Sequence, residues 1–180
     1  ILHDNEVTYA VALHAAPADG PVLYDAVNRA IVRMAADFAA PVEIRQAQPG
    51  ERSQRGPFFC FSRPGATDII ARSGSGGDHV DPLKLAGGAQ RRRTSAILQH
   101  GTLVLDASTE GAVGLGLLAG RPVDFDEAAA ALVRAFEAEL GARFERHPLD
   151  ERELARAEAI RRERYGRPEW LMRSRGKVTS

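Results

Sequence analysis

The stretch KLAGGAQRR at residues 84–92, followed by LQHGTL at residues 98–103, is the most informative part of this 180-residue chain. It predicts one lysine in an apolar turn made flexible by glycines, and an imidazole that returns on a short strand. Gly87 lets the backbone approach a ligand closely, as residues with side chains cannot. Lys84 and His100 together suit a pocket that holds an apolar chain and polarises the carbonyl at its head.

The strands expected around this stretch are short and separated by irregular connections. Apolar or alternating runs predict strands at 2–13, 42–44, 58–61, 68–71, 83–86 and 97–105. A Gly/Ser-rich segment at 73–82 predicts a loop. The arginines at 91–93 predict a solvated turn or a grip on a single anionic group.

Three helices are expected, one between the first two strands and two after the last strand. Apolar residues at helical spacing predict the first helix over 22–38. The second helix begins at Asp124, with Glu127 three residues later as a capping box, and ends at Gly141. The third runs from Asp150 to Gly166 with a charged, salt-bridged face. This order of elements predicts an α+β or mixed-sheet α/β domain rather than a regular βαβ array.

The composition narrows the class of protein. Hydrophobic residues make up 44% of the chain, which is typical of a globular protein. The 24 Lys and Arg balance the 24 Asp and Glu, so the net charge gives no electrostatic reason to bind nucleic acid or a membrane. The single cysteine excludes an intrachain disulfide and favours a cytoplasmic location. We expect one catalytic domain over 1–180 that lacks an N-terminal segment, because the first residues are typical of the inside of a strand.

Each candidate residue also has an ordinary structural interpretation. Lys84 could extend along the surface to water, and His100 could be a half-buried strand histidine with one hydrogen bond. Cys60 is either an apolar core residue or a nucleophile whose pKa a nearby cation would lower. His3 with Asp4 could be an oriented imidazole or a polar strand end. No Cys-x-x-Cys or close His/Asp/Glu cluster occurs, so a built-in transition-metal site is not expected.

Several ordered motifs resemble the catalytic domain shared by lipoate–protein ligase A and the cysteine-dependent octanoyltransferases, relatives of biotin protein ligase. The resemblance rests on five segments that span nearly the whole chain: His3-Asp4 with the strand after it, Cys60-Phe61 with Pro64 and Asp68-Ile69, Lys84 to Gln90, Gln99-His100-Gly101, and Tyr165 to Trp170. The chain departs from the family pattern at Pro82-Leu83 and at Gly88, and the family's Arg-x-x-Gly-Gly segment is not in it.

The resemblance implies a twisted mixed sheet flanked by helices, with an octanoyl or lipoyl chain in an apolar tunnel. It implies transfer of that group to a lysine of a lipoyl acceptor domain, in 2-oxoacid dehydrogenases or in the H protein of the glycine cleavage system. The implied catalytic residues are Cys60 and Lys84. The substrate-binding residues are expected to be His3, Asp68, Gly87, Gly88, Gln90, Gln99, His100 and Gly101.

Two mechanisms and one non-catalytic role are open within this family. In the preferred one, a Cys60 thiolate takes octanoate from an acyl carrier protein thioester and passes it to the acceptor lysine, with no cofactor. In the second, ATP and Mg²⁺ activate free lipoate as an adenylate, with Asp68 near the metal. The altered flank of Lys84 and the missing segment motivate the third, a lipoyl-binding homologue without activity.

Overall fold

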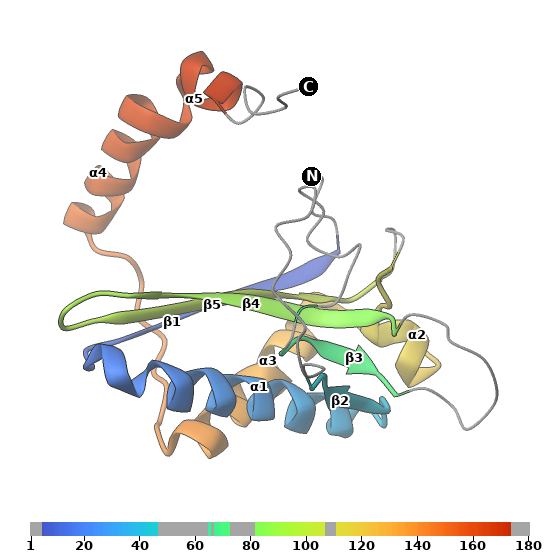
Figure 1. Ribbon diagram of the computed structural model, residues 1–180. Coiled ribbons are helices and arrows are strands. Elements are labelled where there is room, and N and C mark those ends of the chain that lie inside the picture. Colours follow the sequence, from blue (N-terminus) through green and yellow to red (C-terminus); the bar gives the residue numbers. More distant parts are fainter. Residues whose placement is uncertain (1–4, 47–64, 66, 73–81, 107–110, 174–180) are drawn as a thin grey trace, which may run out of the picture. The chain divides into compact units, whose positions relative to one another are not determined.

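The computed structural model describes residues 5–46, 65, 67–72, 82–106 and 111–173 (Figure 1). The chain divides into two compact units, Ile1–Phe144 and Glu145–Ser180. The first unit holds the sheet and the helices that cover it. The second holds α4 (Glu151–Ile160), a π-helical turn (Arg161–Tyr165) and α5 (Pro168–Arg173). The single domain over 1–180 remains an expectation, and the strand expected at 58–61 lies outside the described residues.

A five-stranded sheet with the order β1-β5-β4-β3-β2 forms the centre of the first unit. Its strands are β1 (Glu6–Leu13), β2 (Val42–Ile44), β3 (Ile69–Ala71), β4 (Lys84–Arg92) and β5 (Ile97–Val104). All of these strands pair antiparallel, and an isolated parallel bridge joins Lys84 to Ala112. The expected α+β fold is therefore confirmed.

Strand β4 is longer than the sequence predicts. The pattern ends a strand at 86 because a glycine pair is typical of a turn, whereas the structure continues the strand to Arg92. Pairing explains the difference, since Gly87 and Gly88 lie opposite Thr102 and Gly101 in the ladder with β5. Both strands therefore have glycine where side chains from other elements need room.

Helices α1 (Gly20–Asp37) and α3 (Phe125–Leu140) cover one face of the sheet and pack against each other (Figure 1). Their buried residues Val27, Ile31 and Met34 of α1 and Leu132 of α3 join sheet residues such as Leu103 in one apolar cluster. This burial is the main stabilising contribution to the unit. The part of the chain that the structure describes contains no helix long and apolar enough to cross a membrane.

The helix ends follow the predicted caps with one exception. The Asp124 carboxylate accepts a hydrogen bond from the Glu127 N–H at 2.8 Å, which confirms the N-cap of α3. The Glu127 side chain does not complete the capping box, because it forms a two-bond ion pair with Arg121. At α4 the reciprocal box of Asp150 and Glu153 is complete. The short helix α2 (Leu115–Ala119) has too few turns to give a periodic signal in the sequence.

Candidate active site

The central feature of the site is a buried ion pair between Lys84 and Asp68. The Lys84 Nζ lies 2.8 Å from Asp68 Oδ2, and the two side chains are only 9% and 8% exposed. Lys84 begins β4, and Asp68 directly precedes β3, so two neighbouring strands supply the two charges. The surface-extended interpretation of Lys84 is therefore wrong for this structure. A buried ammonium next to a reacting carbonyl would stabilise negative charge that develops on its oxygen.

Asp68 is fixed from three directions. Its side chain also accepts a hydrogen bond from the Gly65 N–H, and its backbone carbonyl accepts one from the Arg45 N–H at 2.9 Å. The preceding carbonyl, that of Thr67, accepts a hydrogen bond from Asn28 of α1 at 2.9 Å. The carboxylate can therefore hold the lysine in one position.

The ammonium of Lys84 lies directly over Gly87. A Cβ atom added to Gly87 would meet the Cε and Nζ of Lys84 and would lie 2.7 Å from Asp68 Oδ1. The pairing of β3 with β4 shifts register between Ile69 and Ile70, which changes the face on which Lys84 would otherwise lie. Glycine at 87 is therefore required for the ion pair to rest on the sheet.

His100 lies on the same face of the sheet as the Lys84 ammonium. His100 pairs with Ala89 and Thr102 pairs with Gly87, and paired residues of an antiparallel ladder share a face. The imidazole is exposed. We call this face, which lies opposite to the one covered by α1 and α3, the lysine face. It carries Lys84, Gly87 and His100 of the residues expected in the site.

Gln90, Gln99, Gly88 and Gly101 belong to the other face, which the helices cover. The Gln90 amide donates hydrogen bonds to Gln99 Oε1 at 3.0 Å and to the Gly20 carbonyl at the start of α1 at 2.8 Å. Gln99 is fully buried. In this structure the two glutamines connect β4, β5 and α1. Direct contact of these four residues with substrate remains a prediction.

Tyr9 occupies the space that Gly88 and Gly101 leave open, and the sequence reasoning missed it. A Cβ atom on Gly101 would collide with the Tyr9 hydroxyl, and one on Gly88 would lie 3.2 Å from it. The ring meets Phe136 of α3 edge to face at 5.5 Å. Burial raises the pKa of the Tyr9 phenol well above its usual value. An aromatic residue at an inward position of a predicted strand was the signal available in the sequence.

The Tyr9 hydroxyl and Gln99 Nε2 are two buried polar atoms without a well-formed hydrogen bond among the described residues. They lie close to each other, since both are 3.2 Å from the point where a Gly88 Cβ would be. The nearby Tyr24 hydroxyl instead donates to the Gly88 carbonyl at 3.0 Å. Tyr9 therefore contributes to packing more than to polar bonding.

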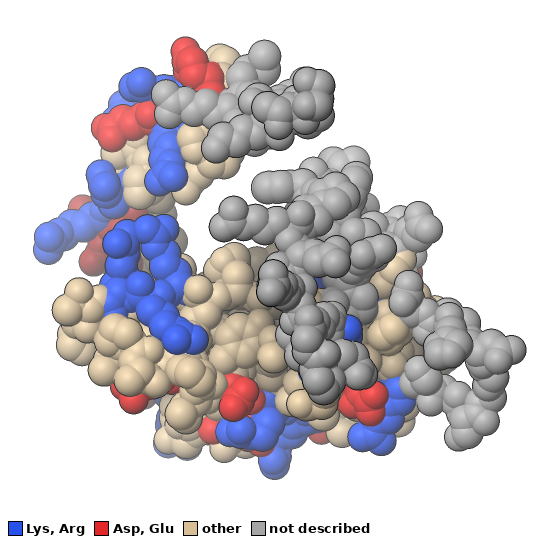
Figure 2. All heavy atoms as spheres, viewed as in Figure 1, with Lys and Arg blue, Asp and Glu red and all other residues tan. Residues whose placement is uncertain are grey.

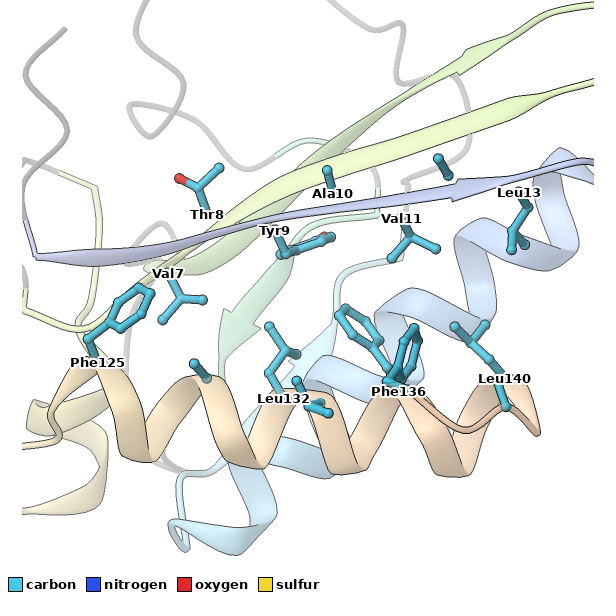
Figure 3. Close-up of a pocket in the computed structure, with 15 residues that line it drawn as sticks. Val7, Thr8, Tyr9, Ala10, Val11, Leu13, Phe125, Leu132, Phe136 and Leu140 are labelled. Carbon is cyan, nitrogen blue, oxygen red and sulfur yellow. The ribbon is translucent and has the colours of Figure 1, made fainter. Parts of the chain in front are cut away.

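An apolar pocket of about 500 Å³ lies between β1 and α3 (Figure 3). Val7, Tyr9 and Val11 of β1 point into it toward Leu132 and Phe136 of α3. Thr8 and Ala10 point to the opposite side of the strand. The pocket is on the helix side of the sheet, so the sheet separates it from the ammonium of Lys84.

Two of the expected site residues, Cys60 and His3, lie outside the described residues. Their roles as nucleophile and substrate-binding residue stay predictions. Among the described residues, no group of three or more His, Cys, Asp or Glu side chains is arranged to hold a metal ion. Asp68, expected near Mg²⁺ in a ligase, holds an ammonium at 2.8 Å, and that positive charge would repel a cation. The described residues therefore do not fit a Mg²⁺ site at this carboxylate.

Comparison with known proteins gives relatives in sequence and similar folds among solved structures. The chain is 30% identical over 209 residues to octanoyltransferase LipM of Kyrpidia tusciae, which covers 96% of this chain and 70% of that protein. Among solved structures, a bipartite lipoate protein ligase of Thermoplasma acidophilum matches with a TM-score of 0.67 at 18% identity, over 92% of this chain and 63% of the ligase. No family model matches the chain.

A more distant similarity concerns the fold alone. Biotin protein ligase of Aquifex aeolicus has a TM-score of 0.50 at 11% identity, over 77% of this chain and 54% of the ligase. The resemblance and the fold expected from the five motif segments are confirmed by these relatives. The chain spans less than two thirds of the length of the solved ligases that it matches.

Proposed function

Because this chain belongs to the LipM octanoyltransferase family, a family of acyltransferases, we propose that it carries the octanoyl group through a thioester on Cys60. The donor is the octanoyl thioester of acyl carrier protein, and the acceptor is a lysine of a lipoyl domain. Such domains belong to 2-oxoacid dehydrogenases and to the glycine cleavage H protein. The proposal includes a cytoplasmic location, where a nucleophilic thiol stays reduced.

The first step is an exchange of one thioester for another. The Cys60 thiolate attacks the octanoyl carbonyl, a bond forms between sulfur and carbon, and the carrier's thiolate leaves and takes up a proton. Both sides of this step are thioesters, so the free energy changes little and no nucleotide is consumed. Lys84 donates a hydrogen bond to the carbonyl oxygen as negative charge develops on it.

The second step forms the amide. The neutral amine of the acceptor lysine attacks the acyl-Cys60 carbonyl, the Cys60 thiolate leaves, and the proton lost by the amine is taken up by that thiolate. An amide is more stable than a thioester, so this step makes the transfer effectively irreversible. Lys84 stabilises the same oxygen in both steps, while His100 forms a wall of the site and Gly87 gives the room that Lys84 needs.

The buried ammonium of Lys84 is the observation that carries this proposal. It is held by Asp68 at 2.8 Å, above a glycine and on the same face as His100. Because it is fixed before any substrate binds, little reorganisation is needed when charge develops. A lysine whose only role was solubility would extend to water instead.

Mass spectrometry of the intact protein after exposure to octanoyl–acyl carrier protein tests the proposal. We expect one octanoyl adduct, mapped by peptide analysis to Cys60, and transfer of that adduct to a lipoyl domain. C60S should form no stable thioester adduct, and C60A should form no adduct at all. Normal transfer by C60A would overturn the proposal.

A parallel assay with lipoate and ATP distinguishes the ATP-dependent ligase and the non-catalytic homologue from the proposed transferase. Lipoate-dependent release of pyrophosphate that survives in C60A would show a ligase and therefore contradict the thioester mechanism. Binding of octanoate without transfer, either from octanoyl–acyl carrier protein or from lipoate with ATP, would show a homologue without activity.

A further inference from the structure

The hairpin formed by β4 and β5 is strongly basic in a chain of zero net charge. From Lys84 to Leu105 it contains one lysine, which is buried against Asp68, three exposed arginines and no acidic residue. Arg91, Arg92 and Arg93 are all exposed, at the end of the sheet where β4 turns into β5. Figure 2 shows Lys and Arg side chains gathered over this end.

The three arginines have no ion-pair partner among the described residues. Two exposed arginines of the helices that cover the sheet differ from them, since Arg33 pairs with Glu139 and Arg134 with Asp37. Arg92 is held by a hydrogen bond of its Nε to Gln90 Oε1 at 2.6 Å. Arg91 and Arg93 keep their charges available for a partner.

Arg91 lies on the lysine face. It pairs with Leu98 and alternates with Ala89 and Gly87 along the strand, so it shares their face and that of His100. Arg91 lies four positions after Gly87 along the extended strand, a distance of roughly 13 Å. A partner that contacts only the arginines would therefore need an extended group to reach the ammonium of Lys84.

The length of the group that enters the site differs between the acyl donor and the acceptor domain. A lysine side chain extends roughly 6 Å from its backbone, too little to span the gap from the hairpin. A thioester on a phosphopantetheine arm, a chain of about fifteen single bonds, extends about 18 Å. A donor bound at the arginines can therefore reach Lys84 through its arm alone, whereas an acceptor domain would have to extend its folded surface over the lysine face to bring its lysine there.

We propose that Arg91 and Arg93 form the docking surface for the acyl donor, an acidic carrier protein with its acyl group on a phosphopantetheine arm. This inference rests on the proposed function and adds the surface that recognises the donor. The carboxylates of the carrier pair with the two guanidinium groups, and the arm runs along the lysine face past Ala89 to Lys84. Complementary charge of this kind raises the association rate and selects the partner.

The experiment compares two donors with the variant R91Q/R93Q. Octanoyl–acyl carrier protein depends on the docking surface, whereas octanoyl-pantetheine is uncharged and enters the site without it. We expect kcat/KM for octanoylation of Cys60 by the carrier to fall about tenfold, through KM, with the pantetheine rate unchanged. The wild-type carrier rate should fall with added salt, and the variant's rate should depend on salt less.

The matched control is R33Q/R134Q, which removes the same charge from the exposed helix surface. It should leave both rates unchanged, because those arginines lie on α1 and α3. A carrier rate within twofold of wild type in R91Q/R93Q overturns the inference. Equal losses with both donors, or a raised KM for the acceptor domain alone, also overturn it.

Direct binding of the carrier separates this inference from the proposed function. If wild-type protein forms no Cys60 adduct with either donor, the proposed function fails. Fluorescence anisotropy of labelled carrier protein still tests the surface in that case. Weaker binding by R91Q/R93Q than by R33Q/R134Q supports the inference, and equal binding refutes it.

Discussion

Replacing Gly87 by alanine should damage catalysis much more than it damages the fold. The new Cβ would overlap the Cε and Nζ of Lys84 and would lie 2.7 Å from Asp68 Oδ1, closer than the 3.0 Å that real Cβ atoms keep. Asp68 is anchored by its neighbours, so the flexible lysine is the group that must move. We expect G87A to displace the ammonium by about 1 Å and to lower the rate of Cys60 octanoylation on the order of 100-fold.

The neighbouring variant G88A is the matched control, because it adds the same methyl group to the other face of the strand. Its Cβ would lie 3.0 Å from the His100 carbonyl and 3.2 Å from the Tyr9 hydroxyl. Overpacking should cost either variant roughly 1–3 kcal/mol of unfolding free energy. Because only Gly87 lies against the ammonium of Lys84, G87A should lose much more of the rate than G88A, measured in single-turnover mixing with octanoyl–acyl carrier protein.

Combination with K84A tests the cause. If Gly87 acts through Lys84, the double variant G87A/K84A should be no slower than K84A alone. A G87A rate within threefold of wild type would refute the reasoning. Equal losses in G87A and G88A would also refute it, because the effect would then come from the fold.

Three further predictions concern stability. D68N removes the carboxylate charge that lies 2.8 Å from the buried Lys84 ammonium and should cost about 3–5 kcal/mol in urea unfolding. A loss below about 1 kcal/mol would contradict a stabilising buried ion pair. Y9F removes a buried hydroxyl that makes no well-formed hydrogen bond with the residues that the structure describes. The unfolding free energy of Y9F should therefore equal that of wild type or exceed it by up to about 1 kcal/mol, and a clear decrease would show a further partner of the hydroxyl. D124A removes the N-cap of α3 and should cost about 1 kcal/mol in thermal unfolding, whereas D126A in the same helical turn should change it little.

The elements with a strong period or a defined cap were predictable from the sequence. The strand around His100 was expected at 97–105 and is found at Ile97–Val104. The helix that starts after Asp124 was expected from its cap and ends at Gly141 with a positive φ, as a terminal glycine indicates. These features depend on local chemistry, which the sequence contains directly.

Features that depend on contacts between distant segments were not predictable. A glycine pair inside a strand resembles a turn until the partners Tyr9 and Lys84 are known, so β4 was expected to be too short. Glu127 fits a capping box, but the chain brings Arg121 close enough to compete for its carboxylate.

The arrangement of the motif residues on two faces also needed the structure. The family resemblance grouped Lys84, Gln90, Gln99 and His100 into one site. Strand alternation and the register shift beside Lys84 place them on two faces of the sheet. The glutamines face α1, and the Lys84 ammonium lies on the opposite face. The ion pair with Asp68 depends on the pairing of β3 with β4, which no local pattern reveals.

The alternation along β4 has a consequence for how such an enzyme can evolve. Gly87 and Gly88 are neighbours in one short motif, but Gly87 faces the Lys84 ammonium and Gly88 faces Tyr9, so selection on the two positions is expected to differ. Substitutions on the lysine face are expected to change the reaction through the position of Lys84, whereas substitutions at the intervening positions act through the packing of the helices against the sheet.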